Sequence, residues 1–128
     1  MNLAPTCSVY LLEQDSIVTD TIRNLCVENA LSLTCFNSHV ELMSAIQATQ
    51  PCCIIAANDQ PSGQALDLME NLAIEQHQIP VIILGDHNDV HSAVAAIKAG
   101  AIDYIEKPTI YGRLSEQLNR VIKQRAQV

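Results

Sequence analysis

The chain has 128 residues and a formal net charge of −7, which comes from 14 acidic and 7 basic side chains. This length fits one domain with a substantial core, and we expect no second domain within residues 1–128. An apolar content of 48% with 16% charged residues excludes a disordered chain. The acidic balance argues against direct binding of this segment to nucleic-acid phosphates.

We expect no export signal at the N-terminus, because no basic segment is followed there by an apolar one. No later apolar run approaches the length of a membrane span. We therefore expect a cytoplasmic protein with no membrane contact. The cysteines form an odd set without a CxxC pair, so we interpret them as small buried hydrophobic side chains rather than a metal or redox site. They are Cys7, Cys26, Cys35, Cys52 and Cys53.

The first part of the chain predicts two strands, each followed by a helix. Residues 8–12 form a short apolar strand, and Asp15 or Ser16 can cap the helix after it. Residues 31–36 alternate apolar and polar side chains, which indicates a strand near a sheet edge. Ser38 begins a capping box that opens a second helix. The apolar positions are Val18, Ile22, Leu25 and Cys26 in the first helix and Val40, Met43 and Ile46 in the second.

A buried strand is predicted at the centre of the chain. Residues 52–57 are apolar and are followed by the polar, turn-forming residues 58–63. In an open α/β sheet, ligands and chemistry gather just beyond the carboxyl ends of the central strands, so residues 57–60 should face the functional site. The last residue of this strand, however, is Ala57, which has no functional group.

The second half predicts three helices and two further strands. The helices begin near residue 64, near residue 90 and after residue 110, and the strands cover residues 81–84 and 102–105. Gly100 ends the middle helix as a C-cap. The apolar positions of the three helices are Leu66, Met69, Leu72 and Ala73, then Val90, Ala93, Val94 and Ile97, then Leu114, Leu118, Val121 and Ile122.

This alternation of strands and helices predicts an α/β fold, with a parallel sheet wrapped on both faces. Polar groups directly follow three of the strands. They are Glu13-Gln14-Asp15, Ala57-Asn58-Asp59 and Glu106-Lys107.

Several motifs in the second half occur in a fixed order. They are residues 79–84, Asp89-Val90, Ala93-Val94, Lys98-Ala99-Gly100-Ala101 and Asp103-Tyr104-Ile105-Glu106-Lys107-Pro108. With them the chain, from about Val9 to Val121, resembles the receiver domain of bacterial two-component response regulators, the CheY-like domain. The resemblance implies a (βα)5 doubly wound parallel sheet of the flavodoxin-like type, with five strands in the order 2-1-3-4-5. It also implies a signal-transduction protein rather than an enzyme, either standing alone or as the N-terminal part of a longer regulator.

Receivers of this family accept a phosphoryl group from a histidine kinase on an aspartate at the end of the third strand. Two acidic residues after the first strand bind Mg²⁺, a Ser or Thr after the fourth strand contacts the phosphoryl oxygens, and a Lys before a Pro pairs with the phosphate. An aromatic residue on the fifth strand reports the state to a partner-binding face. Positioning and charge neutralisation are what phosphoryl transfer requires from a protein.

Four positions of the chain match this pattern. Lys107 and Pro108 match the Lys-Pro pair, and Pro108 is the candidate for a cis peptide bond. Tyr104 matches the aromatic position, and Glu13 matches the first acidic position. The resemblance therefore implies that the charged and aromatic parts of a phosphorylation site are partly retained.

Three other positions depart from the pattern. Gln14 stands where the second carboxylate is expected, and Gly85 stands at the Ser/Thr position. The family places a proline four residues after the phosphoacceptor, and counting back from Pro61 reaches Ala57. Asp59 becomes the acceptor only if the strand slips by two residues, which stays open as an alternative.

These losses have chemical consequences. An alanine cannot form an acyl phosphate, so the resemblance implies a pseudo-receiver that is not phosphorylated at the usual site. Mg²⁺ requires several oxygen ligands, and Glu13 is the one strong ligand left at an expected position, with Asp15 or Asp59 as an auxiliary. We expect Mg²⁺ binding to be weak or lost, and no other cofactor. Lys107 should then pair with Glu13 or Asp59, unless it is an ordinary surface lysine.

The expected partners are other signalling proteins or an effector domain of the same protein. The fourth helix, fifth strand and fifth helix form the expected surface, which could also support a homodimer. Two alternatives stay open: a phosphorelay receiver phosphorylated on Asp59, and a small cofactor-binding protein of the flavodoxin-like architecture. For the latter the chain lacks a Gly-rich phosphate loop after the first strand. The candidate interface residues are Lys98, Asp103, Tyr104 and Arg113.

Overall fold

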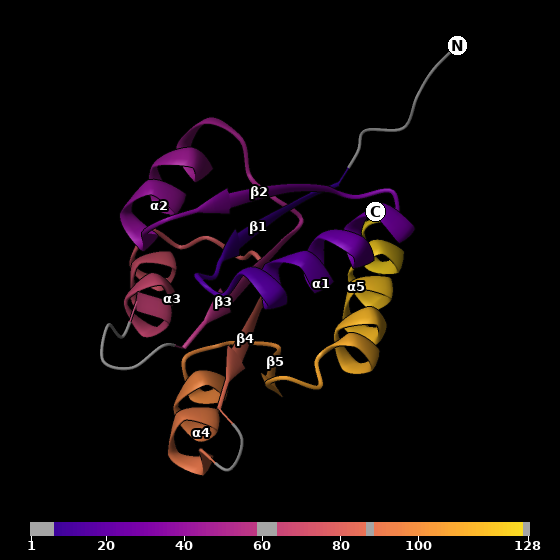
Figure 1. The fold of residues 1–128 in the computed structure, drawn as a ribbon. Coiled ribbons are helices and arrows are strands. Elements are labelled where there is room, and N and C mark those ends of the chain that lie inside the picture. Colours follow the sequence, from indigo (N-terminus) through magenta and orange to yellow (C-terminus); the bar gives the residue numbers. More distant parts are fainter. Residues whose placement is uncertain (1–6, 59–63, 87–88, 127–128) are drawn as a thin grey trace.

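A computed structural model describes residues 7–58, 64–86 and 89–126 of the chain (Figure 1). Strands and helices alternate throughout, as the sequence predicts. The strands are β1 (Ser8–Leu12), β2 (Ser32–Phe36), β3 (Cys53–Ala57), β4 (Val81–Gly85) and β5 (Asp103–Glu106). The helices are α1 (Ser16–Glu28), α2 (His39–Ala48), α3 (Gln64–Ile74), α4 (Val90–Lys98) and α5 (Tyr111–Ala126). Among the described residues, no helix is long and apolar enough to cross a membrane.

The strands form one parallel sheet in the order β2-β1-β3-β4-β5, which confirms the predicted order. All residues of β3 and β4 are buried, because these strands have a neighbour on each side and helices on both faces. β2 is an edge strand, as its sequence predicts, but its exposure does not alternate throughout, because the consecutive residues Thr34 and Cys35 are both exposed. Because the strands are parallel, the residues at their carboxyl ends meet at one edge of the sheet.

Two hydrophobic clusters hold the layers together. The helices α1 and α5 cover one face of the sheet, and α2, α3 and α4 cover the other (Figure 1). Burying a large aliphatic side chain contributes about 1.5–3 kcal/mol, so these clusters supply most of the stability of the fold. Fully buried members of the first cluster include Ile22, Leu25 and Leu114, and those of the second include Leu42, Ile54 and Leu68.

The helix ends follow the capping residues of the sequence. Asp15, rather than Ser16, caps α1, because its Oδ1 accepts hydrogen bonds from the backbone N–H groups of Ile17 (2.8 Å) and Val18 (3.3 Å). Ser38 caps α2 by accepting from the N–H of Glu41 at 3.2 Å. Gly100 follows α4 with a φ of 109°, which is the left-handed conformation expected after a helix end.

The apolar positions of two helices need correction. Val40 is 65% exposed, and Leu42 takes its place in the core with Met43 and Ile46. The cause is helical geometry, since two residues correspond to about 200° around the helix and place Val40 nearly opposite Leu42. In α3 the inner face carries Ala65 and Leu68 beside the predicted Met69 and Leu72, whereas Leu66 and Ala73 are exposed. Short helices with apolar residues on several sides leave the core-facing side undecided in the sequence.

The cysteines are reduced thiols without disulfides. Cys26, Cys52 and Cys53 are buried as predicted, whereas Cys35 is exposed on the edge strand β2, so the prediction is wrong for that residue. Burial raises the pKa of the Cys26 thiol to about 11, and burial also raises the pKa of Cys53. These buried thiols behave as core side chains rather than as nucleophiles.

Candidate functional site

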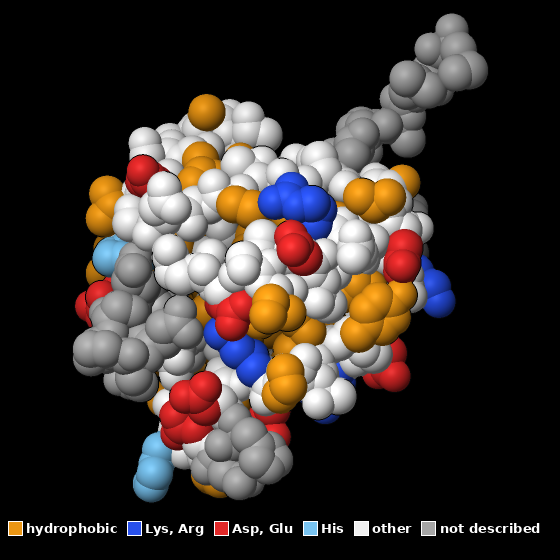
Figure 2. Space-filling view, viewed as in Figure 1, with side chains coloured by type: hydrophobic (Ala, Val, Ile, Leu, Met, Phe, Trp, Pro, Cys, Tyr) orange, Lys and Arg blue, Asp and Glu red, His pale blue; other side chains and the backbone are white. Residues whose placement is uncertain are grey.

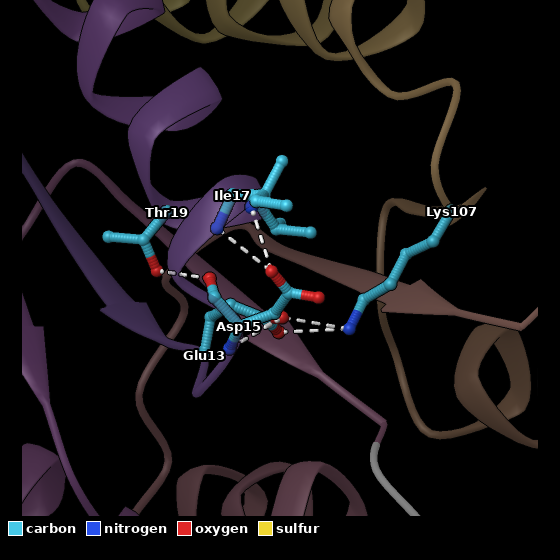
Figure 3. A network of polar contacts seen from close by, with 6 residues as sticks. Glu13, Asp15, Ile17, Thr19 and Lys107 are labelled. Atoms are coloured by element: carbon cyan, nitrogen blue, oxygen red, sulfur yellow. Dashed lines mark hydrogen bonds and ion pairs between the residues drawn. The ribbon is translucent and has the colours of Figure 1, made fainter.

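An ion pair crosses the carboxyl edge of the sheet. Glu13 follows β1 directly, and Lys107 follows β5 directly. The Lys107 Nζ lies 2.8 Å from Oε1 and 3.1 Å from Oε2 of Glu13 (Figure 3). β1 and β5 are separated in the sheet by β3 and β4, so the lysine reaches over the ends of both central strands. The Glu13 side chain is 0% exposed and that of Lys107 is 17% exposed.

This geometry decides between two interpretations of Lys107. The prediction that Lys107 pairs with Glu13 is confirmed, and the alternative of an ordinary surface lysine is wrong. The physical reason is that a carboxylate without contact to water needs a cation and hydrogen-bond donors. The other predicted partner, Asp59, lies outside the described residues.

The remaining acidic-pocket candidates point elsewhere. The Asp15 carboxylate accepts the capping hydrogen bonds at the start of α1 (Figure 3), and its backbone N–H donates to Glu13 Oε1 at 3.3 Å. The Gln14 amide donates to the backbone carbonyl of Asn37 at 3.3 Å and is exposed. Of these three residues, Glu13 is therefore the one whose side chain meets Lys107.

Two features of the described residues around Glu13 bear on Mg²⁺ binding. Both Glu13 oxygens contact the Lys107 Nζ, and the neutral Gln14 amide is turned toward the loop before α2. Mg²⁺ requires near-octahedral ligation by several oxygens. Across residues 7–58, 64–86 and 89–126, no group of three or more His, Cys, Asp and Glu side chains is arranged to hold a metal ion.

Ala57 is the last residue of β3, as the sequence predicts, and is 4% exposed. It lies opposite Leu84 of β4 in the sheet register. The next residue, Asn58, donates its backbone N–H to the Leu84 carbonyl at 2.7 Å, and its buried side-chain Oδ1 has no hydrogen-bond partner. The residues needed to judge the Asp59 alternative, Asp59 and Pro61, lie outside the described residues.

The side chain of Tyr104 lies against Gly85 at the end of β4. A Cβ built on Gly85 would lie 1.7 Å from the Tyr104 Oη and 2.1 Å from Cζ. The Tyr104 Oη is buried and has no hydrogen-bond partner. Burial raises the pKa of the Tyr104 phenol above its usual value, and the negative charge of Asp89 adds to the shift. Tyr104 is thus an inward-facing aromatic residue.

Asp103 is not an exposed interface residue, so that prediction is wrong. It is 6% exposed, and its carboxylate accepts hydrogen bonds from Arg113 Nε (2.7 Å), Arg113 Nη2 (2.9 Å) and Gln117 Nε2 (2.8 Å). A buried carboxylate has to be paired, and these partners come from α5 of the same chain. The Arg113 side chain remains 58% exposed, so one end of this network reaches the surface.

The outer side of α4 carries apolar residues in contact with solvent. Within this helix only Ala96 is buried. A shallow depression of about 330 Å³ is lined by Ala93, Val94, Ile97 and Lys98. The apolar spacing correctly predicts a helix, but most of its large apolar side chains do not enter the core. The exposed residues are Val90 (68%), Val94 (47%) and Ile97 (50%), together with Ile102 (43%) just after the helix.

The backbone settles one positional prediction. The peptide bond between Lys107 and Pro108 is cis, as predicted. Lys98 is exposed at the end of α4, beside the depression. Sequence reasoning placed Asn58 at this edge of the sheet without giving it a role, and it missed Gln117. A signal for Gln117 was available, because it lies four residues after Arg113 and hence on the same side of α5.

On the face shown in Figure 2, acidic and basic side chains of the described residues lie beside one another, and the hydrophobic ones form several separate areas. This face therefore offers no continuous basic area for a nucleic-acid backbone among the residues drawn in colour.

The fold and the edge of the sheet define a doubly wound α/β protein of the flavodoxin-like class, with its polar groups at the carboxyl ends of β1, β3, β4 and β5. Within that class, the chain belongs to the response regulator receiver domain family, which it matches over residues 9–119. The resemblance seen in the sequence is thereby confirmed.

Among curated proteins, the chain is similar to the response regulator protein TodT of Pseudomonas putida, with 33% identity over 78% of the chain and 44% of the relative. It is also similar to the transcriptional regulatory protein FixJ of Bradyrhizobium diazoefficiens, with 26% identity over 91% of the chain and 57% of the relative. The chain spans about half the length of these relatives.

Solved structures of receivers have the same fold. The response regulator receiver protein from Pseudoalteromonas atlantica superimposes with a TM-score of 0.82 at 22% identity, covering 92% of this chain and 98% of the other. Full-length FixJ from B. japonicum gives a TM-score of 0.81 at 25% identity, covering 94% of this chain and 60% of the other.

Proposed function

We propose that this chain is an atypical receiver domain, a pseudo-receiver that is not phosphorylated at the usual site and acts through protein–protein contacts. The observation that carries the proposal is Ala57, which ends β3 at the place where the family pattern expects the aspartate. A methyl group offers no oxygen for a phosphoryl group. The domain then has no phosphorylation reaction of its own at that position, and we expect no enzymatic activity.

The charged part of the site supports the same proposal. A working receiver needs its acidic residues for Mg²⁺ and its lysine for the phosphoryl group. In this chain Glu13 and Lys107 are engaged with each other at 2.8 Å. Their pairing satisfies both charges without metal or phosphate. We infer that Mg²⁺ binding is weak or lost and that no other cofactor takes its place.

The partner surface is proposed at α4, β5 and α5. Exposed apolar residues are uncommon in groups on monomeric proteins, and the group formed by Val90, Val94, Ile97 and Ile102 is typical of an interaction site. Lys98, Tyr104 and Arg113 lie on the same elements. The partner is another signalling protein, a second copy of this chain, or an effector domain of a longer cytoplasmic regulator. FixJ, a transcriptional regulatory protein nearly twice as long as the matched segment, illustrates the last case.

The test is incubation with acetyl phosphate and Mg²⁺, followed by intact mass measurement. We expect no phosphoryl adduct on the wild-type chain. Ala57→Asp is the matched variant, because it restores the carboxylate at the end of β3, and we expect it to gain an adduct. An adduct on the wild type that disappears in Asp59→Asn would overturn the proposal and establish the alternative acceptor.

The sequence leaves two alternative functions open. The first is phosphorylation on Asp59. The mass measurement with acetyl phosphate distinguishes it from the proposal. A small flavodoxin-like cofactor carrier gains no support from the family match, which assigns the fold to signalling receivers. A fold shared between families does not by itself transfer a cofactor.

A further inference from the structure

Gly85 is a glycine for reasons of space and not of backbone conformation. Among the described glycines, Gly100 has a positive φ of 109°, whereas Gly85 does not have one. A Cβ at Gly85 would lie 1.7 Å, 2.1 Å and 2.7 Å from the Oη, Cζ and Cε2 atoms of Tyr104. Real Cβ atoms do not approach other heavy atoms closer than 3.0 Å. Any side chain at position 85 therefore excludes the observed position of the Tyr104 ring.

The inward position of Tyr104 is held by shape. Tyr104 lies opposite Ile83 in the register of β4 and β5, and it packs against the core cluster under α2, α3 and α4. Its buried Oη and the buried Oδ1 of Asn58 at the end of β3 form no hydrogen bond of ordinary distance and angle, although the Asn58 side chain interacts with the Tyr104 phenol and lowers its pKa. A buried hydroxyl without a partner costs stability and does not hold a ring in place. The space left by Gly85 does.

We propose that Gly85 and Tyr104 form a steric lock that fixes the surface between α4 and β5 in one arrangement, independently of the pocket around Glu13 and Lys107. The strand that carries the ring is joined to α5, because the backbone N–H of Tyr104 donates to the Asp103 carboxylate at 2.8 Å and Asp103 in turn accepts from Arg113. The lock rests on the proposed function, because that proposal assigns partner binding to this surface. The domain then presents one constant surface instead of switching between two.

The Tyr104 phenol itself reports the state of the lock. The chain has no Trp and three Tyr, so Tyr10→Phe/Tyr111→Phe leaves Tyr104 as the single source of tyrosinate absorbance. In the locked position the pKa of Tyr104 is raised by burial and by the carboxylates of Asp89, Asp86 and Glu106. A ring displaced into water should titrate closer to its usual value.

The experiment compares Gly85→Ala with Gly112→Ala in that background. Gly112 is the matched control, because an added Cβ meets nothing within 4 Å there. We expect Gly85→Ala to raise the unfolding equilibrium constant at least about tenfold and to lower the Tyr104 pKa, through overpacking or displacement of the ring. Gly112→Ala should change neither quantity in that direction. In a Tyr104→Ala background, Gly85→Ala should cost much less.

Three results would overturn the lock. They are an unchanged Tyr104 pKa in Gly85→Ala, a stability cost no larger than that of Gly112→Ala, and an equal cost of Gly85→Ala with Tyr or Ala at position 104. If Gly85→Ala does not fold alone, folding of Gly85→Ala/Tyr104→Ala supports the lock and failure of both overturns it. These measurements contain no phosphoryl donor, so they test the steric lock alone. Whether the chain is phosphorylated is tested by the mass measurement with acetyl phosphate, and either proposal can therefore fail without the other.

Discussion

The two sides of the pocket at the carboxyl edge of the sheet differ in what they retain. On the β1 and β5 side, Glu13 and Lys107 keep their charges and bind each other at 2.8 Å. On the β3 and β4 side, Ala57 and Gly85 carry no functional group at all. The charged side persists because each ion offsets the burial of the other. The neutral side leaves no void at Gly85, because the Tyr104 side chain occupies the space there.

The largest effect is expected from breaking the charged side. Lys107→Met leaves the Glu13 carboxylate, which is 0% exposed, without its cation. We expect a loss of about 3 kcal/mol in the free energy of unfolding, measured by urea denaturation. Glu13→Gln should cost less, because the partly exposed Lys107 can turn to water. Lys98→Met on the exposed end of α4 is the control and should change stability by no more than about 0.5 kcal/mol. Equal costs for Lys107→Met and Lys98→Met would show that the pair does not stabilise the fold.

Asp103 is a second buried carboxylate, and its removal tests whether the pairing of Glu13 with Lys107 stabilises the fold more than another buried carboxylate network does. Asp103→Ala removes the acceptor of the Tyr104 N–H and of the buried Gln117 amide. We expect a loss of about 2 kcal/mol, because the Tyr104 N–H, the Gln117 amide and the Arg113 guanidinium all lose their acceptor, and the exposed Arg113 can turn to water whereas the buried Gln117 amide cannot. Glu116→Ala, an exposed acid on the same helix as Gln117, is the control. A cost for Asp103→Ala as small as that of the control would mean that the network is replaced by water.

The capping carboxylate beside Glu13 should matter less. Asp15→Ala removes the side-chain acceptor for the N–H groups of Ile17 and Val18. A lost N-cap costs about 1 kcal/mol, and we expect this value from thermal or urea unfolding. Asp20→Ala, at an exposed position within α1, is the matched control. If Asp15→Ala cost as much as Lys107→Met, Asp15 would belong to the charged side of the pocket and not merely to the helix cap.

The smallest effect concerns the neutral side. Tyr104→Phe removes a buried hydroxyl that has no hydrogen-bond partner and leaves the ring in place. We expect stability to stay the same or to rise by up to about 1 kcal/mol, because the hydroxyl no longer has to be desolvated. A clear loss of stability in the same unfolding measurement would reveal a hydrogen bond of Tyr104 Oη in solution, for example to Asn58.

The sequence predicts the element order, the end of β3 at Ala57 and the Glu13–Lys107 pair, because these follow from apolar periodicity and from the need to pair a buried charge. It does not predict the contact of Gly85 with Tyr104. The resemblance implies that β4 and β5 are adjacent, but the contact also depends on the side-chain rotamer of Tyr104, which neither the resemblance nor the local pattern contains. Asp103 was misplaced for a related reason, since its partners lie on α5 and only the fold brings them together.

The internal pairing of Asp103 with Arg113 also determines how the α4, β5 and α5 surface would respond to ionic strength. These opposite charges neutralise each other within the chain, so a partner there meets mainly Val90, Val94, Ile97 and Ile102. Apolar contacts are not screened by salt, in contrast to exposed ion pairs. Association through this surface should therefore vary little with salt concentration and should strengthen in solutions of sulfate, which favour apolar burial.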